Sequence, residues 1–206
     1  MKRLVLLLAI TCISSAAIAQ KADVSFVVGG SFVSDAKATF LGPTGPSAIT
    51  TTVHTDHHIF LEGAFAVRLL NARVAALHVE VPIAGIPSQT VTAGTPSSEL
   101  SHLSTVFVTP GIRLKLAPFA PISPWASIGG GWAHYSFDAP AGTQNKAALE
   151  YGGGIDFKTG FPLLGFRAEV RDYVTNTPNS GLAGVSLPSG LSRHNVLLGG
   201  GVVVRF

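Results

Sequence analysis

The side chains best suited to chemistry in this sequence are acids and bases that recur at every second position of otherwise apolar segments. They are Glu62, Arg68, Glu80, Arg113, Lys115, Glu150, Asp156, Arg167, Glu169, Arg171 and Arg205. Five acids and six bases nearly neutralise one another, and a charge buried without a partner costs several kcal/mol. If they share one enclosed space, two interpretations follow: a packed network of ion pairs, or a narrow ion path through that network.

A second candidate is the cluster of His54, His57 and His58 around Asp56. Imidazole suits zinc or copper, so this group could bind a divalent metal. A segment that faces solvent and lipid headgroups needs no metal, however, and the sequence contains no CxxC or HExxH pattern. We therefore expect no metal site and no organic cofactor.

A third candidate is the pair His134 and Ser136, which lie on one face if their segment is extended. A histidine that activates a serine is the core of acyl-transfer catalysis. Glu150, one hairpin away, falls on the face that carries the other charges, and no oxyanion donor is identifiable. We expect that the protein is not an enzyme, with His134 and Ser136 as the alternative catalytic pair.

The segments that carry these residues alternate with a period of two, the pattern of half-buried strands. In Arg73 to Ala84, the clearest case, Val79 and Val81 take one face and Glu80 the other. The expected strands run over about 23–34, 56–69, 73–84, 105–116, 123–137, 146–157, 164–174 and 192–206. No segment holds a 3.6-residue period, and the count predicts eight strands, with ten as the alternative.

The composition places these strands in a membrane. Only 12% of the residues are charged, where soluble domains average about 25%, and the mean hydropathy is +0.42. No segment after the N-terminal region approaches the apolar length of a spanning helix, so the backbone has to be satisfied between strands of a closed barrel. We predict an all-β, antiparallel up-and-down transmembrane barrel. A soluble lipocalin-like barrel would show the same alternation with its two faces exchanged.

The N-terminus predicts export. Lys2 and Arg3 precede an apolar stretch, Leu4 to Ile13, and small residues end in Ala17-Ile18-Ala19. This order is typical of a secretory signal peptide, residues 1–19, cleaved to leave a single domain over 20–206. The exported chain then carries 12 basic residues of the total of 14 against 11 acidic ones, which excludes a basic nucleic-acid surface.

Long and short connectors alternate between the expected strands, as in outer-membrane barrels, where periplasmic turns are short and extracellular loops long. The long connectors are rich in Gly, Pro, Ser and Thr, as in the segment from Leu41 to Pro46. Three glycine triplets, at 129–131, 152–154 and 199–201, are expected to let a narrow barrel bend and its strands approach closely.

Several segments together resemble the small outer-membrane barrels typified by OmpA and OmpX. They are Ser127-Ile128-Gly129-Gly130-Gly131-Trp132, Gly152-Gly153-Gly154-Ile155-Asp156-Phe157 and Phe166-Arg167-Ala168-Glu169-Val170-Arg171-Asp172-Tyr173. The resemblance covers the whole exported chain and implies the barrel more than any activity. The aromatic residue Phe206, which ends a strand, resembles the terminal signal by which such barrels are recognised for assembly.

The resemblance implies location in the bacterial outer membrane, contact with its lipid and lipopolysaccharide, and handling by periplasmic chaperones and the barrel-assembly machinery. We expect a monomeric, non-enzymatic barrel with a structural or surface-interaction role carried by its extracellular loops. One alternative is a small channel for ionic or hydrophobic solutes. Another is an acyl hydrolase that modifies lipid A, since small barrel enzymes of that kind use an H-x-S arrangement like His134 and Ser136.

Overall fold

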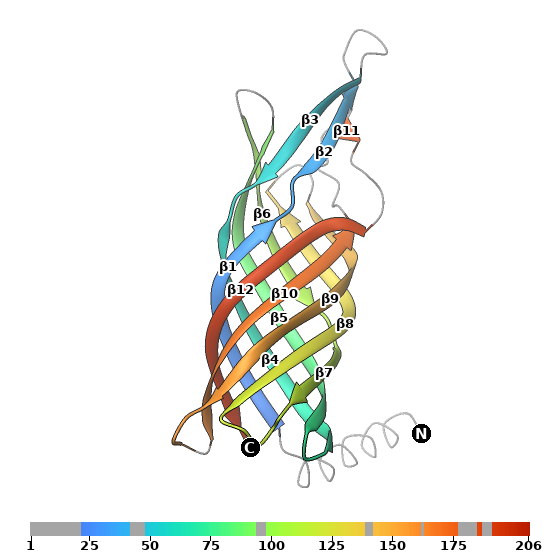
Figure 1. The fold of residues 1–206 in the computed structure, drawn as a ribbon. Coiled ribbons are helices and arrows are strands. Elements are labelled where there is room, and N and C mark those ends of the chain that lie inside the picture. Colours follow the sequence, from blue (N-terminus) through green and yellow to red (C-terminus); the bar gives the residue numbers. More distant parts are fainter. Residues whose placement is uncertain are drawn as a thin grey trace, which may run out of the picture.

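Eight antiparallel strand positions close into a barrel in the computed structural model, which describes residues 22–41, 48–93, 98–138, 142–161, 163–176, 185–186 and 191–206 (Figure 1). The wall consists of β1 (Ala22–Val33), β4 (His58–Asn71), β5 (Ala75–Ala93), β6 (Ser98–Val108) with β7 (Gly111–Leu116), β8 (Ile122–Phe137), β9 (Thr143–Lys158), β10 (Leu164–Asn176) and β12 (Leu191–Arg205). Each position pairs with its sequence neighbour in the wall, so the predicted all-β, up-and-down barrel is confirmed.

The first and last strands close the wall. β1 pairs with β12 in one unbroken register, from Asp23 opposite Arg205 to Val33 opposite Asn195. The amide of Phe206 also donates to the carbonyl of Ala22 at 2.8 Å. Both ends of the described barrel chain therefore lie at one rim, which we call the terminal end, and the opposite rim is the loop end (Figure 1).

The wall strands lie where the alternation predicted them, but the connectors at the loop end contain more strand than expected. β2 (Ala36–Leu41) and β3 (Ala48–Thr55) form a hairpin in the first expected loop, and β11 (Val185–Ser186) pairs with β2. β5 and β6 also extend past their expected limits. Threonine and other β-branched residues in these segments favour extended backbone, which the high polarity had concealed. The predicted signal peptide and the Gly42–Pro46 segment lie outside the described residues.

The fourth wall position is broken at Thr109 and Pro110, between β6 and β7. Proline has no amide hydrogen and cannot donate to the ladder, so strand pairing stops there. The amide of Thr109 still reaches the carbonyl of Pro82 on β5 at 3.4 Å, which holds the two wall positions together across the break. Side chains keep their faces on both sides of it, since Thr109 and Arg113 are both buried.

The two faces of the wall have opposite chemistry. Phe26, Ile59 and Phe166 point outward and are 62%, 64% and 54% exposed, while Arg113 and Arg167 point inward and are about 1–2% exposed. A soluble barrel would show the reverse, so the lipocalin-like alternative is wrong. The strands of β1, β4, β9, β10 and β12 have 12 to 16 residues, enough to cross a hydrocarbon core that needs about 9–11. Among the described residues, no helix has the length and apolar character needed to span a bilayer.

The glycine triplets make room for bulky side chains inside the barrel. A Cβ atom at Gly154 would come within 2.7 Å of the Trp125 ring, and one at Gly152 within 2.8 Å of the Arg171 side chain. A Cβ at Gly199 would meet the ring of Phe60 at 2.7 Å. At Gly131 and Gly201 a Cβ would instead meet only the backbone of the neighbouring strand, at 2.0 and 1.8 Å. The triplets therefore allow close approach both to inward side chains and to adjacent strands, in addition to the expected bending of the wall.

Candidate functional site

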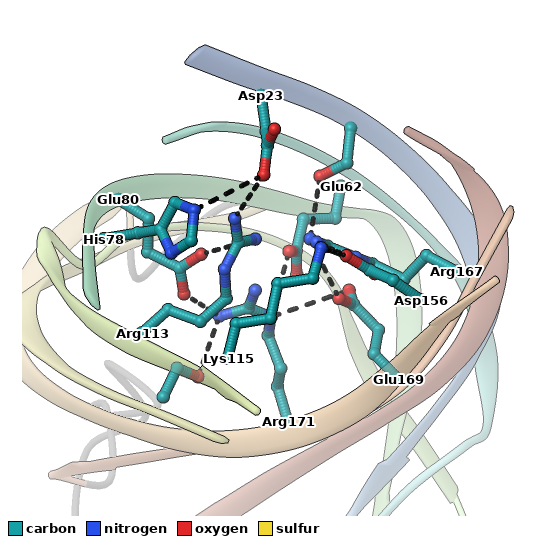
Figure 2. Close-up of polar contacts among 12 residues, drawn as sticks. Asp23, Glu62, His78, Glu80, Arg113, Lys115, Asp156, Arg167, Glu169 and Arg171 are labelled. Carbon is teal, nitrogen blue, oxygen red and sulfur yellow. Dashed lines mark hydrogen bonds and ion pairs between the residues drawn. The ribbon is translucent and has the colours of Figure 1, made fainter. Parts of the chain in front are cut away.

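The lumen is the candidate functional site, and its two halves differ. The half toward the terminal end holds the network of charged side chains, and the half toward the loop end holds mainly aromatic and aliphatic ones, with Arg193 buried beside Tyr135. Figure 2 shows the charged half, in which side chains from strands all around the wall point toward one another. Inward positions alternate along every strand, so each strand contributes one side chain per layer.

Arg171 on β10 is the hub of the charged half. Its guanidinium lies 3.1 Å from Glu62 on β4, 3.1 Å from Glu80 on β5 and 2.9 Å from Glu150 on β9. Glu169, two residues earlier on the same strand, is 3.5 Å away. Four carboxylates thus surround one cation that is itself about 1% exposed, and the planar guanidinium can serve several of them at once.

Arg113 on β7 links this hub to β1. Its Nη1 lies 3.1 Å from Glu80, and its Nη2 donates to Asp23 at 3.0 Å. His78 Nε2 is 3.8 Å from the same Asp23 carboxylate. Glu80 therefore bridges Arg113 from the adjacent strand and Arg171 from across the lumen, which joins β1, β5, β7 and β10 in one network.

Asp156 on β9 is the second hub, nearer the terminal end. Arg167 donates to both of its oxygens, at 2.8 and 3.2 Å, in the bidentate geometry that makes arginine–carboxylate pairs strong. The Lys115 ammonium donates to the same carboxylate, and Arg205 Nη2 lies 3.6 Å from it. Here one carboxylate contacts three cations, whereas around Arg171 one cation contacts four carboxylates.

The indole of Trp125 on β8 lies among the arginines. The guanidinium carbons of Arg167, Arg171 and Arg113 are 4.8, 5.0 and 5.7 Å from its ring centroid. Cations within about 6 Å of an aromatic face are attracted by the ring quadrupole. The Trp125 ring therefore stabilises three like charges without adding a charge of its own.

Most of the loop-end half of the lumen is an apolar core, which differs from the polar interior that the alternating charges predicted. Its buried members are Val27, Phe60, Ala84, Ile86, Leu103, Phe107, Ala133, Tyr135, Ala148, Tyr173 and Leu197. The rings of Phe107 and Tyr173 stack at 4.5 Å, and Tyr173 donates to Glu62 at 3.2 Å, which joins the two halves. Phe60, Phe107, Tyr135 and Tyr173 are 0% exposed, so side chains fill the lumen at this level.

The structure brings nine of the eleven predicted charged residues into the buried network. The remaining two, Arg68 and Arg205, face inward but lie half-buried at the terminal rim, and Arg68 forms no ion pair with any described residue. A bulge at Arg68 and Leu70 keeps Arg68 inward while Leu69 and Leu70 face outward.

The prediction missed several inward residues. They are Asp23, Trp125, Ser127, Tyr173, Arg193 and Asn195. Asp23 and Arg193 stand in strands with weak alternation, although each is two positions from another inward polar residue, Ser25 and Asn195. Trp125 and Tyr173 were hidden because an aromatic residue in a membrane barrel is expected to face lipid.

The other two candidate clusters lie outside the lumen. His54 contacts Asp35 at 2.6 Å and Asp56 at 3.7 Å, while the His57 ring packs against Phe32 with ring centroids 4.8 Å apart. Within the described part of the chain, no group of three or more His, Cys, Asp or Glu side chains could hold a metal ion.

His134 and Ser136 lie on the outer face of β8. His134 Nδ1 is 2.7 Å from Asn145 Oδ1 on β9, and Glu150 lies on the inner face, where Ser127 and Arg171 contact it. The barrel wall thus separates the carboxylate from the histidine. Phe206 is 65% exposed at the terminal rim, and its role as an assembly signal stays a prediction.

A closed wall of eight strands, an aliphatic exterior and an ion-paired interior define an integral-membrane β-barrel of the small outer-membrane type. The outer membrane protein OprG from Pseudomonas aeruginosa shares this fold: the TM-score is 0.59 at 12% identity, over 91% of this chain and 96% of OprG. The expected resemblance to small outer-membrane barrels is confirmed at the level of the fold.

Two further solved structures are similar. Neisserial surface protein A matches with a TM-score of 0.49 at 12% identity, over 88% of this chain and 97% of its own. Ail, the attachment invasion locus protein of Yersinia pestis, matches with a TM-score of 0.41 at 15% identity, over 90% and 99%. No family model matches the sequence, and no curated protein matches it.

Proposed function

We propose that this protein is a closed, non-enzymatic barrel of the bacterial outer membrane that presents an extracellular β-sheet for structural or surface interactions. The observation that carries the proposal is the filled lumen. Arg113, Arg167, Arg171, Tyr135, Tyr173, Phe60 and Phe107 are each less than 2% exposed. A water-sized molecule therefore reaches almost none of these side chains, in the charged half or in the apolar half.

The strands beyond the wall support the surface role. β2 and β3 continue past β1 and β4 at the loop end, and β11 and the upper part of β5 pair with their edges (Figure 1). The terminal end has only short turns. Barrels of this type keep both termini in the periplasm, so the β2–β3 hairpin would face the cell exterior.

Orientation is tested with an epitope inserted between Leu41 and Ala48, and with the same epitope inserted at Gly160 in the turn between β9 and β10. On intact cells we expect antibody to label the first variant only, and to label both after the outer membrane is permeabilised. Labelling of the Gly160 variant alone on intact cells would contradict the proposed orientation.

Closure is tested by conductance in planar bilayers. Protein refolded in detergent should migrate differently on a denaturing gel before and after boiling, which identifies the folded barrel. The folded fraction should add no stable conductance steps to the bilayer. Reproducible steps that change with salt concentration would instead favour the small-channel alternative, with the charged half of the lumen as its filter.

A further inference from the structure

A pocket opens at the terminal end of the barrel, below the charged network. Its volume is about 480 Å³, within the range of roughly 300–1,000 Å³ that is common for small-molecule sites. Six strands each contribute one inward side chain to it: Asp23, Arg68, His78, Lys115, Lys158 and Arg205. The pocket is therefore built by the closed wall as a whole and exists only in the folded barrel.

The pocket has an excess of positive charge. Four of these six side chains are cations and one is an acid, and that acid, Asp23, is already engaged by Arg113 at 3.0 Å. Lys115 and Arg205 share Asp156 with Arg167, so one carboxylate serves three cations. Counting an α-carboxylate on Phe206 as well still leaves more cations than anions.

Several donors at the pocket lack hydrogen bonds. Nε and Nη2 of Arg205 are buried and have no hydrogen-bond partner among the described residues. Arg68 pairs with no carboxylate of the described chain. Buried polar atoms without partners are costly, and a bound anion would supply acceptors to several of these groups at once.

The rim of the pocket is apolar, and a hydrogen bond fixes the turn that carries part of it. Phe119, Leu163 and Phe206 line it and are 61%, 58% and 65% exposed. The turn that carries Phe119 is fixed because Lys158 donates to the carbonyl of Pro118 at 2.8 Å. In the same turn Ala117 has a φ of 45°, a left-handed conformation that alanine rarely adopts and that surrounding contacts have to maintain.

We propose that this pocket binds an anionic amphiphile, with a carboxylate or phosphate held by Arg68 and Arg205 and an apolar chain against Phe119, Leu163 and Phe206. A cationic floor beside an apolar rim fits a molecule with both characters better than an inorganic ion. Such a ligand could be a free fatty acid or an anionic phospholipid of the adjoining leaflet, and both present the same chemistry.

The test is a titration of octanoate into the full-length barrel in phosphatidylcholine nanodiscs, followed by calorimetry. Arg68→Gln should raise the dissociation constant about tenfold, since a charge-assisted hydrogen bond is lost. Arg73→Gln removes the same charge at the same end but outside the pocket and should change nothing. Octan-1-ol should bind equally to wild type and Arg68→Gln.

Equal octanoate affinity in wild type and Arg68→Gln, or no octanoate binding at all, would overturn the proposal. Heat-dependent gel migration checks that each variant is folded, and Arg205→Gln provides a second variant from another strand, also expected to bind octanoate more weakly. Replacing part of the phosphatidylcholine by phosphatidylglycerol then identifies the source. If octanoate affinity falls in wild type more than in Arg68→Gln, the phospholipid occupies the pocket; if both respond alike, the pocket takes a free amphiphile.

Discussion

At the scale of single residues, the charged half of the lumen depends on how many partners each ion has. Arg171 faces four carboxylates and Asp156 faces three cations, so neither can be removed without leaving several like charges together. Arginine suits the first position because its fork of donors reaches Glu62, Glu80 and Glu150 at once, which a lysine ammonium could not match.

Loss of the hub cation should be far more damaging than loss of one of its anions. Arg171→Met leaves four buried carboxylates around an uncharged side chain, and we expect a loss of about 3–5 kcal/mol in the free energy of unfolding. Glu62→Gln removes one of the four negative charges and can keep the contact with Tyr173, so its effect should stay within about 1 kcal/mol. Urea unfolding in lipid vesicles measures both.

The fluorescence of Trp125 offers a direct readout of the same core. Trp125 and Trp132 are the only two tryptophans of the chain, and Trp132 faces outward, so a Trp132→Phe background isolates the buried one. Disruption by Arg171→Met should shift the Trp125 emission, and Glu62→Gln should leave it nearly unchanged. Equal stability of the two variants would contradict the role given to Arg171.

At the scale of the strand, the glycines of one triplet meet different surroundings on the inner and outer faces of the wall. Gly154 leaves space for the Trp125 ring inside the barrel, whereas a Cβ at Gly130 would meet nothing within 4 Å. We expect Gly154→Ala to destabilise the barrel by about 1–3 kcal/mol through overpacking, and Gly130→Ala to change stability by no more than about 0.5 kcal/mol.

Unfolding in urea with each variant in the same lipid would distinguish the two positions. Both changes add one methyl group to a β-strand, so their difference separates the crowding at Gly154, against the Trp125 ring and the Ala168 carbonyl, from the intrinsic preference of alanine over glycine. Equal effects at the two positions would mean that the triplets act through backbone conformation alone.

The alternation identified the wall strands because their outer face is largely apolar, while their inner face carries charged and polar residues at many positions. Glu80 beside Val79 and Val81 is the clearest example, and the structure buries Glu80 as that pattern requires. The same alternation places Phe60 on the face of Glu62 and Phe107 on the face of Thr105, both buried, but the charges elsewhere on that face led to the expectation of a polar interior throughout. The alternation could not show which ions share a partner, because Arg171, Glu62 and Glu80 come from different strands.

At the scale of the whole molecule, the closed wall should tolerate chain ends at a different connector. Ala22 and Phe206 are joined by a backbone hydrogen bond of 2.8 Å, so a short linker could connect them. A circular permutant with new ends between Leu41 and Ala48 should fold in detergent and show the same heat-dependent gel migration as the protein with its native ends.

A chain that lacks Leu191–Phe206 should not fold in this way, because β12 closes the wall. Folding of that truncated chain would contradict the conclusion that the closing strand is essential.

The pairing of β1 with β12 also has a consequence for folding. The contacts that seal the wall join residues at opposite ends of the chain, such as Asp23 and Arg205, so they have a very high contact order. Until β12 arrives, the partial sheet keeps two open edges with unpaired backbone groups, which invite association with other chains. The early strands therefore cannot form a closed barrel by themselves. An unfolded chain of this kind has to be protected from aggregation with other copies until β12 is available to pair with β1.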